Sequence, residues 1–225
     1  QDNLDKAKTR LINLGSFLKG HGADDVMYVN ATLGVVTVTG VGHFFFLADP
    51  TIPDNANLTI EMMHLTLMQV HDLRVAHAKK HNCAASPFLT WDHQVDGCRV
   101  NKNKAKFAYE AWLVHSRQVG RASDNYMVVG HTHDLMDAIL AIVSRKIKEG
   151  LVIKTLQDLA EATLLAFKDS DTYISVTVLH SVHHWTAFFD GYVPPLEKTA
   201  AHVPDIERPH RFEFHLNPNT EQVEL

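Results

Sequence analysis

The order of apolar patterns along the chain constrains its fold more than any single motif. Between residues 25 and 46, β-branched and aromatic residues bounded by glycines predict two or three antiparallel strands in a meander. After a proline-containing loop at 49–56, helical and strand-like patterns alternate as far as about residue 148. A meander followed by alternating helices and strands predicts an α/β fold, in which a mixed sheet is covered by helices.

The elements after the meander can be placed from their periodicity and their terminal residues. We expect a helix capped by Asn57 and running to about His81, a strand from Phe88 to Val95, a helix that follows residues 101–104 and ends near Gly120, a strand over 126–129 and a helix from Thr132 to about Lys148. Further on, we expect a helix from Thr155 to Phe167, a strand from Tyr173 to Leu179, a short helix from His183 to Tyr192 and a strand from Arg211 to Leu216.

No internal repeat, low-complexity segment or flexible linker divides these elements. We therefore expect a core over residues 1–150 and a C-terminal α/β extension over residues 151–225, packed on the same domain. A frayed terminal turn would explain the alternating charges of residues 2–10. Asp2 and Asp5 stand at what would be the end of a first strand, so we expect that strand of the core to be truncated.

Composition limits the classes of protein to which the chain can belong. It has no apolar run long enough to span a bilayer and no signal-like start, so we expect no membrane partner. Its two cysteines, Cys83 and Cys98, offer no disulfide framework and favour a nuclear or cytoplasmic location over secretion. The net charge of −5 argues against binding nucleic acid by electrostatics alone, but not against an enzyme that holds metal ions between carboxylates.

The stretch from Gly130 to Asp137 has the composition of a site. A short apolar strand ends, a glycine turns the chain, and the start of a helix brings His131, His133 and Asp137 together. Because His133 and Asp137 are four residues apart, they share a helical face on which a cation could be held. Helix initiation by Thr132 explains part of the same stretch.

The order meander, helix, strand, helix, strand, helix is that of the ribonuclease H-like fold, and the carboxylates follow it. Asp96 ends a buried strand, Asp137 lies on the last core helix, and Asp2 and Asp5 precede the meander. Carboxylates at the ends of neighbouring strands converge on one edge of a sheet. Their hard oxygen ligands suit two Mg²⁺ or Mn²⁺ ions acting on a phosphodiester, so we expect a metal site. The expected ligands are Asp2, Asp5, Asp96, Asp137 and His131, with Asp2 favoured over Asp5 as the primary one.

Basic and amide residues lie beside these acidic positions. Asn101, Lys102, Asn103 and Lys104 should begin the helix after Asp96 and offer backbone N–H groups and a lysine to a phosphate. Lys8 and Arg10 lie beside the first carboxylates. We interpret these six residues as nucleic-acid-binding, while a plain capped helix start and solvated charged faces remain alternative explanations.

Three blocks of the sequence resemble a known family. The blocks are Asp2-Asn3-Leu4-Asp5-Lys6-Ala7-Lys8-Thr9-Arg10-Leu11, Gln94-Val95-Asp96-Gly97 with Asn101-Lys102-Asn103-Lys104, and Gly130-His131-Thr132-His133 with Asp137. They resemble a large uncharacterised eukaryotic family of transposase-like, ribonuclease H-like domains with the patterns D-G-x-D-x-x-K-T-R-L, Q-x-D-N-x-x-x-N-K-N and G-H-T-H-x-x-x-D. Residues 209–214 are similar to a closing block of that family, and the His-x-x-x-Asp pair also resembles RuvC-type nucleases.

This resemblance implies a transposase-derived nuclease or strand transferase that depends on divalent metal. Its catalytic residues would be Asp2, Asp96, His133 and Asp137, with the histidine near the attacking water. Its partner would be nucleic acid, with DNA favoured over RNA, and a homo-oligomer is compatible with the sequence. The chain departs from the family patterns at Asn3, Gly97 and Leu135, and it starts at the first block without the strand that should precede it.

Other interpretations stay open. The altered positions and the low pI are compatible with a catalytically inactive, domesticated domain that serves as a binding or assembly module. Gly-His-Thr-His also looks like the last motif of calcineurin-type metallophosphoesterases, but the upstream motifs of that class are missing. His180, His183 and His184 are interpreted as surface histidines, because no carboxylate or cysteine accompanies them at ligand spacing.

Overall fold

The computed structural model describes residues 6–13, 31–84, 90–96, 102–127, 135–192, 211–217 and 223–224. The strands are β1 (Lys6–Asn13), β2 (Thr32–Val38), β3 (Gly42–Ala48), β4 (Thr90–Asp96), β5 (Arg121–Met127), β6 (Tyr173–Leu179), β7 (Arg211–Leu216) and β8 (Val223–Glu224). The helices are α1 (Ala56–Lys80), α2 (Lys104–His115), α3 (Leu135–Lys148), α4 (Leu156–Ala166) and α5 (Trp185–Tyr192).

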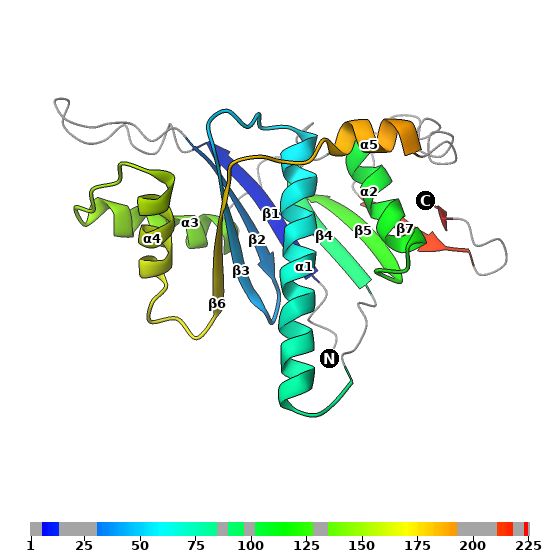
Figure 1. Ribbon diagram of the computed structural model, residues 1–225, viewed down its shortest axis with the longest axis horizontal. Helices are drawn as coiled ribbons and strands as arrows, with labels where there is room; N and C mark the ends of the chain where they lie inside the picture. Colours follow the sequence, from blue (N-terminus) through cyan, green and yellow to red (C-terminus); the bar gives the residue numbers. More distant parts are fainter. Residues whose placement is uncertain are drawn as a thin grey trace.

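Within the described residues the strands form one eight-stranded sheet in the order β6-β3-β2-β1-β4-β5-β7-β8 (Figure 1). The meander β1-β2-β3 is antiparallel, whereas β1, β4 and β5 are parallel to one another. At the two sides of this core, β6 adds parallel to β3 and β7 adds antiparallel to β5. The expected mixed α/β sheet flanked by helices is therefore confirmed.

Helices cover the two faces of the sheet at different places. On one face, α1, α2 and α5 enclose a core that includes Phe44, Trp91 and Phe214. On the other face, α3 and α4 cover the part formed by β2, β3 and β6 (Figure 1). Because β2 and β3 are packed on both faces, they read as continuous apolar runs instead of alternating ones.

The start of α1 differs from the sequence prediction by two residues. Its N-cap is Asn55, whose side chain accepts a hydrogen bond of 2.9 Å from the Asn57 backbone N–H, so the expected cap at Asn57 was wrong. The Asn57 side chain instead accepts a 2.8 Å hydrogen bond from the backbone N–H of Thr186 in α5. Asn57 therefore joins two helices that cover the same face of the sheet.

The interpretation of residues 2–10 as a frayed turn was wrong for residues 6–10, which form part of the central strand β1. Its backbone pairs with β2 on one side, from Ala7 opposite Val38 to Asn13 opposite Thr32. On its other side Lys6 and Lys8 pair with Asp92 and Gln94 of β4. The strand was missed because its lysines and arginine give it the composition of a solvated terminus.

The residues after 150 extend the sheet at both ends of its strand order, through β6 beside β3 and through β7 beside β5. Both strands have the bounds that the sequence predicted. In the described part of the chain, no helix is long and apolar enough to cross a membrane.

Candidate functional site

Several of the residues expected to form the metal site lie outside the described part of the chain. They are Asp2, Asp5, Asn101, His131 and His133. The roles assigned to them stay predictions. Asp96 and Asp137 can be located within elements.

Asp96 is the last residue of β4, and it pairs with Met127, the last residue of the parallel strand β5. The two strands therefore end at the same edge of the sheet, as expected. Asp96 follows Gln94 by two residues, so the two positions share a face of the strand.

Asp137 lies in the first turn of α3. The preceding residue, Met136, is anchored to β2, because the Thr37 hydroxyl donates a hydrogen bond of 3.3 Å to its sulfur. Thr37 pairs with Lys8, and Lys8 pairs with Gln94. The first turn of α3 thus contacts the sheet two strands away from β4, which is roughly 10 Å at the usual strand spacing.

The block that includes Lys102, Asn103 and Lys104 begins α2, as predicted. The Asn103 side chain accepts a 2.8 Å hydrogen bond from the Lys106 backbone N–H and caps the helix. The ammonium group of Lys102 lies 4.7 Å from the centre of the Tyr126 ring, near the end of β5. Lys104 is exposed. The two lysines therefore differ in how firmly the protein holds them.

This difference gives a test of the nucleic-acid interpretation. If both lysines contact phosphates, Lys102→Ala and Lys104→Ala should each lower the slope of log affinity against log salt by about 1. Fluorescence anisotropy with a labelled oligonucleotide at several salt concentrations measures this slope. Lys146→Ala, on α3, serves as the control because its ammonium group pairs with Glu149 at 2.6 Å. Unchanged slopes would assign the two lysines to helix initiation and solubility.

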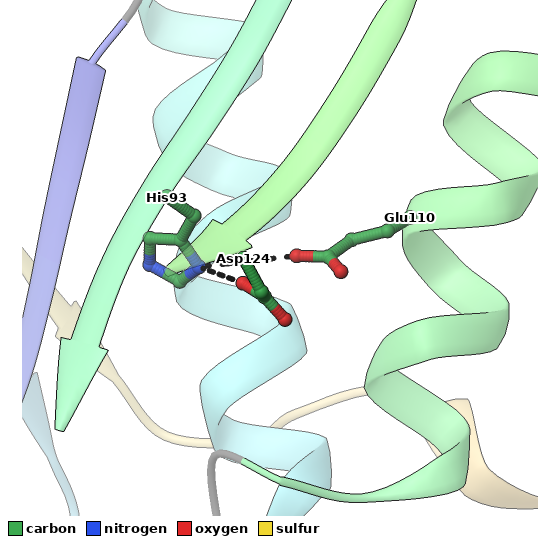
Figure 2. Close-up of side chains that lie close together, drawn as sticks. All are labelled: His93, Glu110 and Asp124. Carbon is green, nitrogen blue, oxygen red and sulfur yellow. Dashed lines mark ion pairs between the residues drawn. The ribbon is translucent and has the colours of Figure 1, made fainter. Parts of the chain in front are cut away.

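A cluster of buried ionisable side chains lies between β4, β5 and α2, and its residues are not among those expected from the sequence to form a site. Figure 2 shows His93, Glu110 and Asp124 pointing toward one another from these three elements. The Nδ1 atom of His93 is 3.2 Å from Asp124 Oδ1 and 3.9 Å from Glu110 Oε1. All three side chains are fully buried.

The local structure explains why these residues meet. His93 and Asp124 pair in the parallel register of β4 and β5, so their side chains are neighbours on one face. Lys106 and Glu110 are four residues apart on α2 and form an ion pair of 3.1 Å. Lys106 also forms an ion pair with Asp124 Oδ2, to which the Tyr126 hydroxyl donates a hydrogen bond of 2.9 Å.

Charge and burial act against each other in this cluster. Burial, followed by the negative charge of Asp124, raises the pKa of Glu110 to about 7. Burial alone would raise the pKa of Asp124, but the positive charge of Lys106 holds it below its ordinary value. Burial would lower the pKa of Lys106, but Asp124 and Glu110 raise it. The cluster therefore contains a firmly charged Lys106–Asp124 pair and a Glu110 that is about half protonated near neutral pH.

The raised pKa of Glu110 predicts how stability depends on pH. Between its ordinary pKa of 4.5 and about 7, the folded protein binds more protons at Glu110 than the unfolded chain does. The contribution of this group to the free energy of unfolding is therefore fully present below about pH 4.5, and it falls as pH rises through 7. The loss is on the order of 3 kcal/mol for the shift, at about 1.4 kcal/mol per pKa unit.

Urea denaturation in chelator-containing buffer between about pH 5 and pH 8 measures this dependence. Glu110→Gln removes the titrating group while keeping its shape, so it should flatten the pH profile of the free energy of unfolding. Glu161→Gln, an exposed change on α4, should leave the profile unchanged. A wild-type profile that does not fall toward pH 8 more steeply than that of Glu110→Gln would contradict the prediction.

Three features show that the cluster could hold a metal ion. His93, Glu110 and Asp124 each offer one ligand atom, and these atoms all lie within 4.8 Å of one another. Glu110 Oε2 is buried and accepts no hydrogen bond from any residue that the structure describes. The donor set of one imidazole and two carboxylates is typical of divalent cations.

The sequence signal for this cluster is polar residues at inward-facing strand positions. His93 lies between the buried Trp91 and Val95, and Asp124 lies between the buried Ala122 and Tyr126. An ionisable side chain at a core position needs a partner, and each of these two residues supplies one for the other.

A second buried carboxylate, Glu61 of α1, anchors the segment between β6 and α5. It accepts hydrogen bonds from the Trp185 indole at 2.7 Å and from the backbone N–H of His183 at 3.2 Å, and the His183 ring Nδ1 is 2.9 Å away. In the sequence, no carboxylate stands at ligand spacing from His183. The structure supplies one from a residue 122 positions earlier in the chain.

The fold and the cluster define a mixed α/β protein with a buried, ionisable core site. The chain belongs to the family described as Domain of unknown function (DUF7869), whose model matches residues 23–225. No curated protein and no solved structure matches the chain.

Proposed function

We propose that the protein is a transposase-derived, ribonuclease H-like nuclease or strand transferase that acts on nucleic-acid phosphodiesters with divalent metal. The observation that carries this proposal is the shared edge of β4 and β5, where Asp96 ends one strand beside Met127 of the other. Asp137 follows in the first turn of the next helix, α3. The element order and the resemblance of the three sequence blocks support the same function.

The proposed centre would hold Mg²⁺ or Mn²⁺ through carboxylate oxygens. Asp96 and Asp137 would be ligands, with His131 as a further one. The register of β1 with β4 places Lys6 opposite Asp92, four residues before Asp96, so the described strands do not support the expected convergence of Asp2 or Asp5 with Asp96. When bound, two such ions stabilise the attacking and leaving oxygens of an in-line displacement. Neutral His133 would orient or deprotonate the attacking water near pH 7.

The start of α2 supports binding of a phosphate near this edge. Lys102 lies against Tyr126, and Tyr126 pairs with Val95, the residue before Asp96. The first backbone N–H groups of α2 come directly after Lys102 in the chain, because the helix begins at Lys104. A cation and a helix N-terminus near strand ends are groups that bind phosphate oxygens.

Cleavage assays with defined substrates test the proposal. The chain is incubated with end-labelled single-stranded DNA, double-stranded DNA and RNA, in Mg²⁺, in Mn²⁺ or in chelator. We expect products only with metal, and we expect Asp137→Asn to remove them. Asp171→Asn, an exposed aspartate between α4 and β6, is the matched control and should retain activity.

Two results would contradict the nuclease proposal. One is the absence of cleavage and of joining on every substrate with either metal. The other is cleavage that Asp137→Asn leaves unchanged. Salt-dependent binding of nucleic acid without cleavage would favour the alternative function, a catalytically inactive binding or assembly module.

A further inference from the structure

We propose that His93, Glu110 and Asp124 bind one divalent transition-metal ion in the core of the protein, at a site separate from the proposed nuclease centre that includes Asp96 and Asp137. The proposal does not depend on nuclease activity. It rests on the side chains drawn in Figure 2, whose ligand atoms converge from β4, α2 and β5.

The spacing of the ligand atoms suits such an ion. With metal–ligand bonds of 2.0–2.1 Å, two ligand atoms of a tetrahedral site lie roughly 3.3 Å apart. The separation between His93 Nδ1 and Asp124 Oδ1 is 3.2 Å, and that between His93 Nδ1 and Glu110 Oε1 is 3.9 Å. A small rotation of the Glu110 side chain would bring the third ligand into range.

The carboxylate of Glu110 also has capacity for a further partner. Its Oε1 atom pairs with Lys106, while its Oε2 atom is buried without a hydrogen-bond donor among the described residues. A buried acceptor without a partner costs about 1–3 kcal/mol, and a metal ion bound through Oε2 would remove that cost. This orphaned oxygen is the observation, independent of the acidic cluster itself, that points to a ligand.

The charge balance leaves room for another cation. When both carboxylates are ionised, two negative charges face the single ammonium group of Lys106. Lys106 and the Tyr126 hydroxyl both contact Asp124 Oδ2, which leaves Oδ1 directed at His93. Lys106 and Tyr126 would thus act as outer partners that fix the orientation of a ligating carboxylate.

The donor set determines the class of metal. An imidazole nitrogen with two carboxylate oxygens favours Zn²⁺, Co²⁺, Fe²⁺ or Mn²⁺ over Mg²⁺ and Ca²⁺, which prefer oxygen ligands alone. The site also lies on a different face of the sheet from Gln94, the neighbouring residue in β4. His93 faces the core under α1 and α2, whereas Gln94 and Asp96 occupy alternate positions of the same strand.

Complete burial of the three ligands implies that the ion is incorporated as the protein folds. The experiment therefore unfolds the whole chain in denaturant with chelator and refolds it with Zn²⁺, with Co²⁺ or without metal. After dialysis, we expect about one metal ion per chain and a higher midpoint of thermal unfolding than for the metal-free sample. The Co²⁺ form should show the visible absorption of a low-coordinate site with a nitrogen ligand.

Two variants locate the ion. Glu110→Gln keeps the size of the side chain but lacks the anionic ligand, so it should lose the bound metal and the Co²⁺ absorption. Asp137→Asn, at the proposed nuclease edge, should retain both, which separates failure of this inference from failure of the proposed function. The metal-free refolded Glu110→Gln protein is checked by circular dichroism, so that loss of metal is not loss of fold.

Either of two results would overturn the proposal. One is a wild-type chain that refolds to the same thermal midpoint with and without metal and retains none after dialysis. In that case the ammonium group of Lys106 would be the cation that balances the charge of the two carboxylates. The other is metal that stays bound, with the same Co²⁺ absorption, in Glu110→Gln, since the ion would then lie elsewhere.

Discussion

Replacing Asp96 with Asn is expected to abolish metal-dependent cleavage by the protein, whereas replacing His133 with Ala is expected only to slow it. The reason follows from the proposed roles. A carboxylate at the end of β4 would hold metal directly, and an amide oxygen there lacks the charge that a divalent cation requires. Loss of an outer partner of a metal ligand already costs roughly 10- to 100-fold in affinity or activity, so loss of a ligand should cost more.

Loss of His133 should reduce the cleavage rate less than loss of Asp96. A histidine that orients or deprotonates water contributes roughly 10²–10⁴-fold, and a metal ion held by the carboxylates would still make the water more acidic without the histidine. Single-turnover cleavage of the best substrate, at saturating Mn²⁺, compares the two variants with wild type. Asp92→Asn, on the same strand, is the control. The Asp92 carboxylate accepts a hydrogen bond of 2.6 Å from the Ser123 hydroxyl, and it lies four residues before the end of the strand. A rate lower for His133→Ala than for Asp96→Asn would reverse the assigned roles.

Strands and helices whose own residues show the expected hydrophobic pattern and terminal residues could be predicted from the sequence. The strands β6 and β7 have the predicted bounds because β-branched or aromatic residues alternate through them and turn residues flank β6. Thr155 was expected to begin α4, and it forms a capping box with Asp158. In these segments local preference and tertiary packing favour the same structure.

A strand whose polar residues are buried through contacts with neighbouring elements could not be predicted in the same way. The sequence Arg121-Ala122-Ser123-Asp124-Asn125 reads as a polar loop, yet it forms most of β5. The prediction began this strand at residue 126. Its polar residues are accommodated by neighbours: Ser123 donates a hydrogen bond to Asp92, and Asp124 pairs with His93 and Lys106. Such compensation depends on strand register, which local sequence does not reveal.

The same distinction applies to the candidate sites. The end of β4 at Asp96 could be predicted, because aromatic and β-branched residues between Phe88 and Val95 predict a strand, and Asp96 and Gly97 are turn residues that end it. The buried cluster could not, because it requires the β4–β5 register and the inward face of α2 at once. The Glu61–His183 contact joins residues 122 positions apart, so no spacing rule would detect it.

The fold should also be sensitive to loss of a single charge in the buried cluster. Lys106 is fully buried, and it is the ammonium group that neutralises Asp124. Replacing Lys106 with Met keeps a long apolar side chain but leaves that carboxylate uncompensated in the core. Breaking a buried ion pair from one side costs about 3–5 kcal/mol. For a domain of this size we expect a thermal midpoint lower by roughly 6–20 °C.

Lys104→Met provides a matched control, since it makes the same substitution two residues earlier on α2, at an exposed position. It should change the free energy of unfolding by less than about 0.5 kcal/mol. The double variant Lys106→Met with Asp124→Asn removes both charges and should recover part of the loss, which a double-mutant cycle in urea measures as a coupling energy. If Lys106→Met is as stable as Lys104→Met, then Asp124 does not depend on this lysine. The negative charge of the cluster would then have to be balanced in another way, either by protonation of the carboxylates or by the metal ion proposed above.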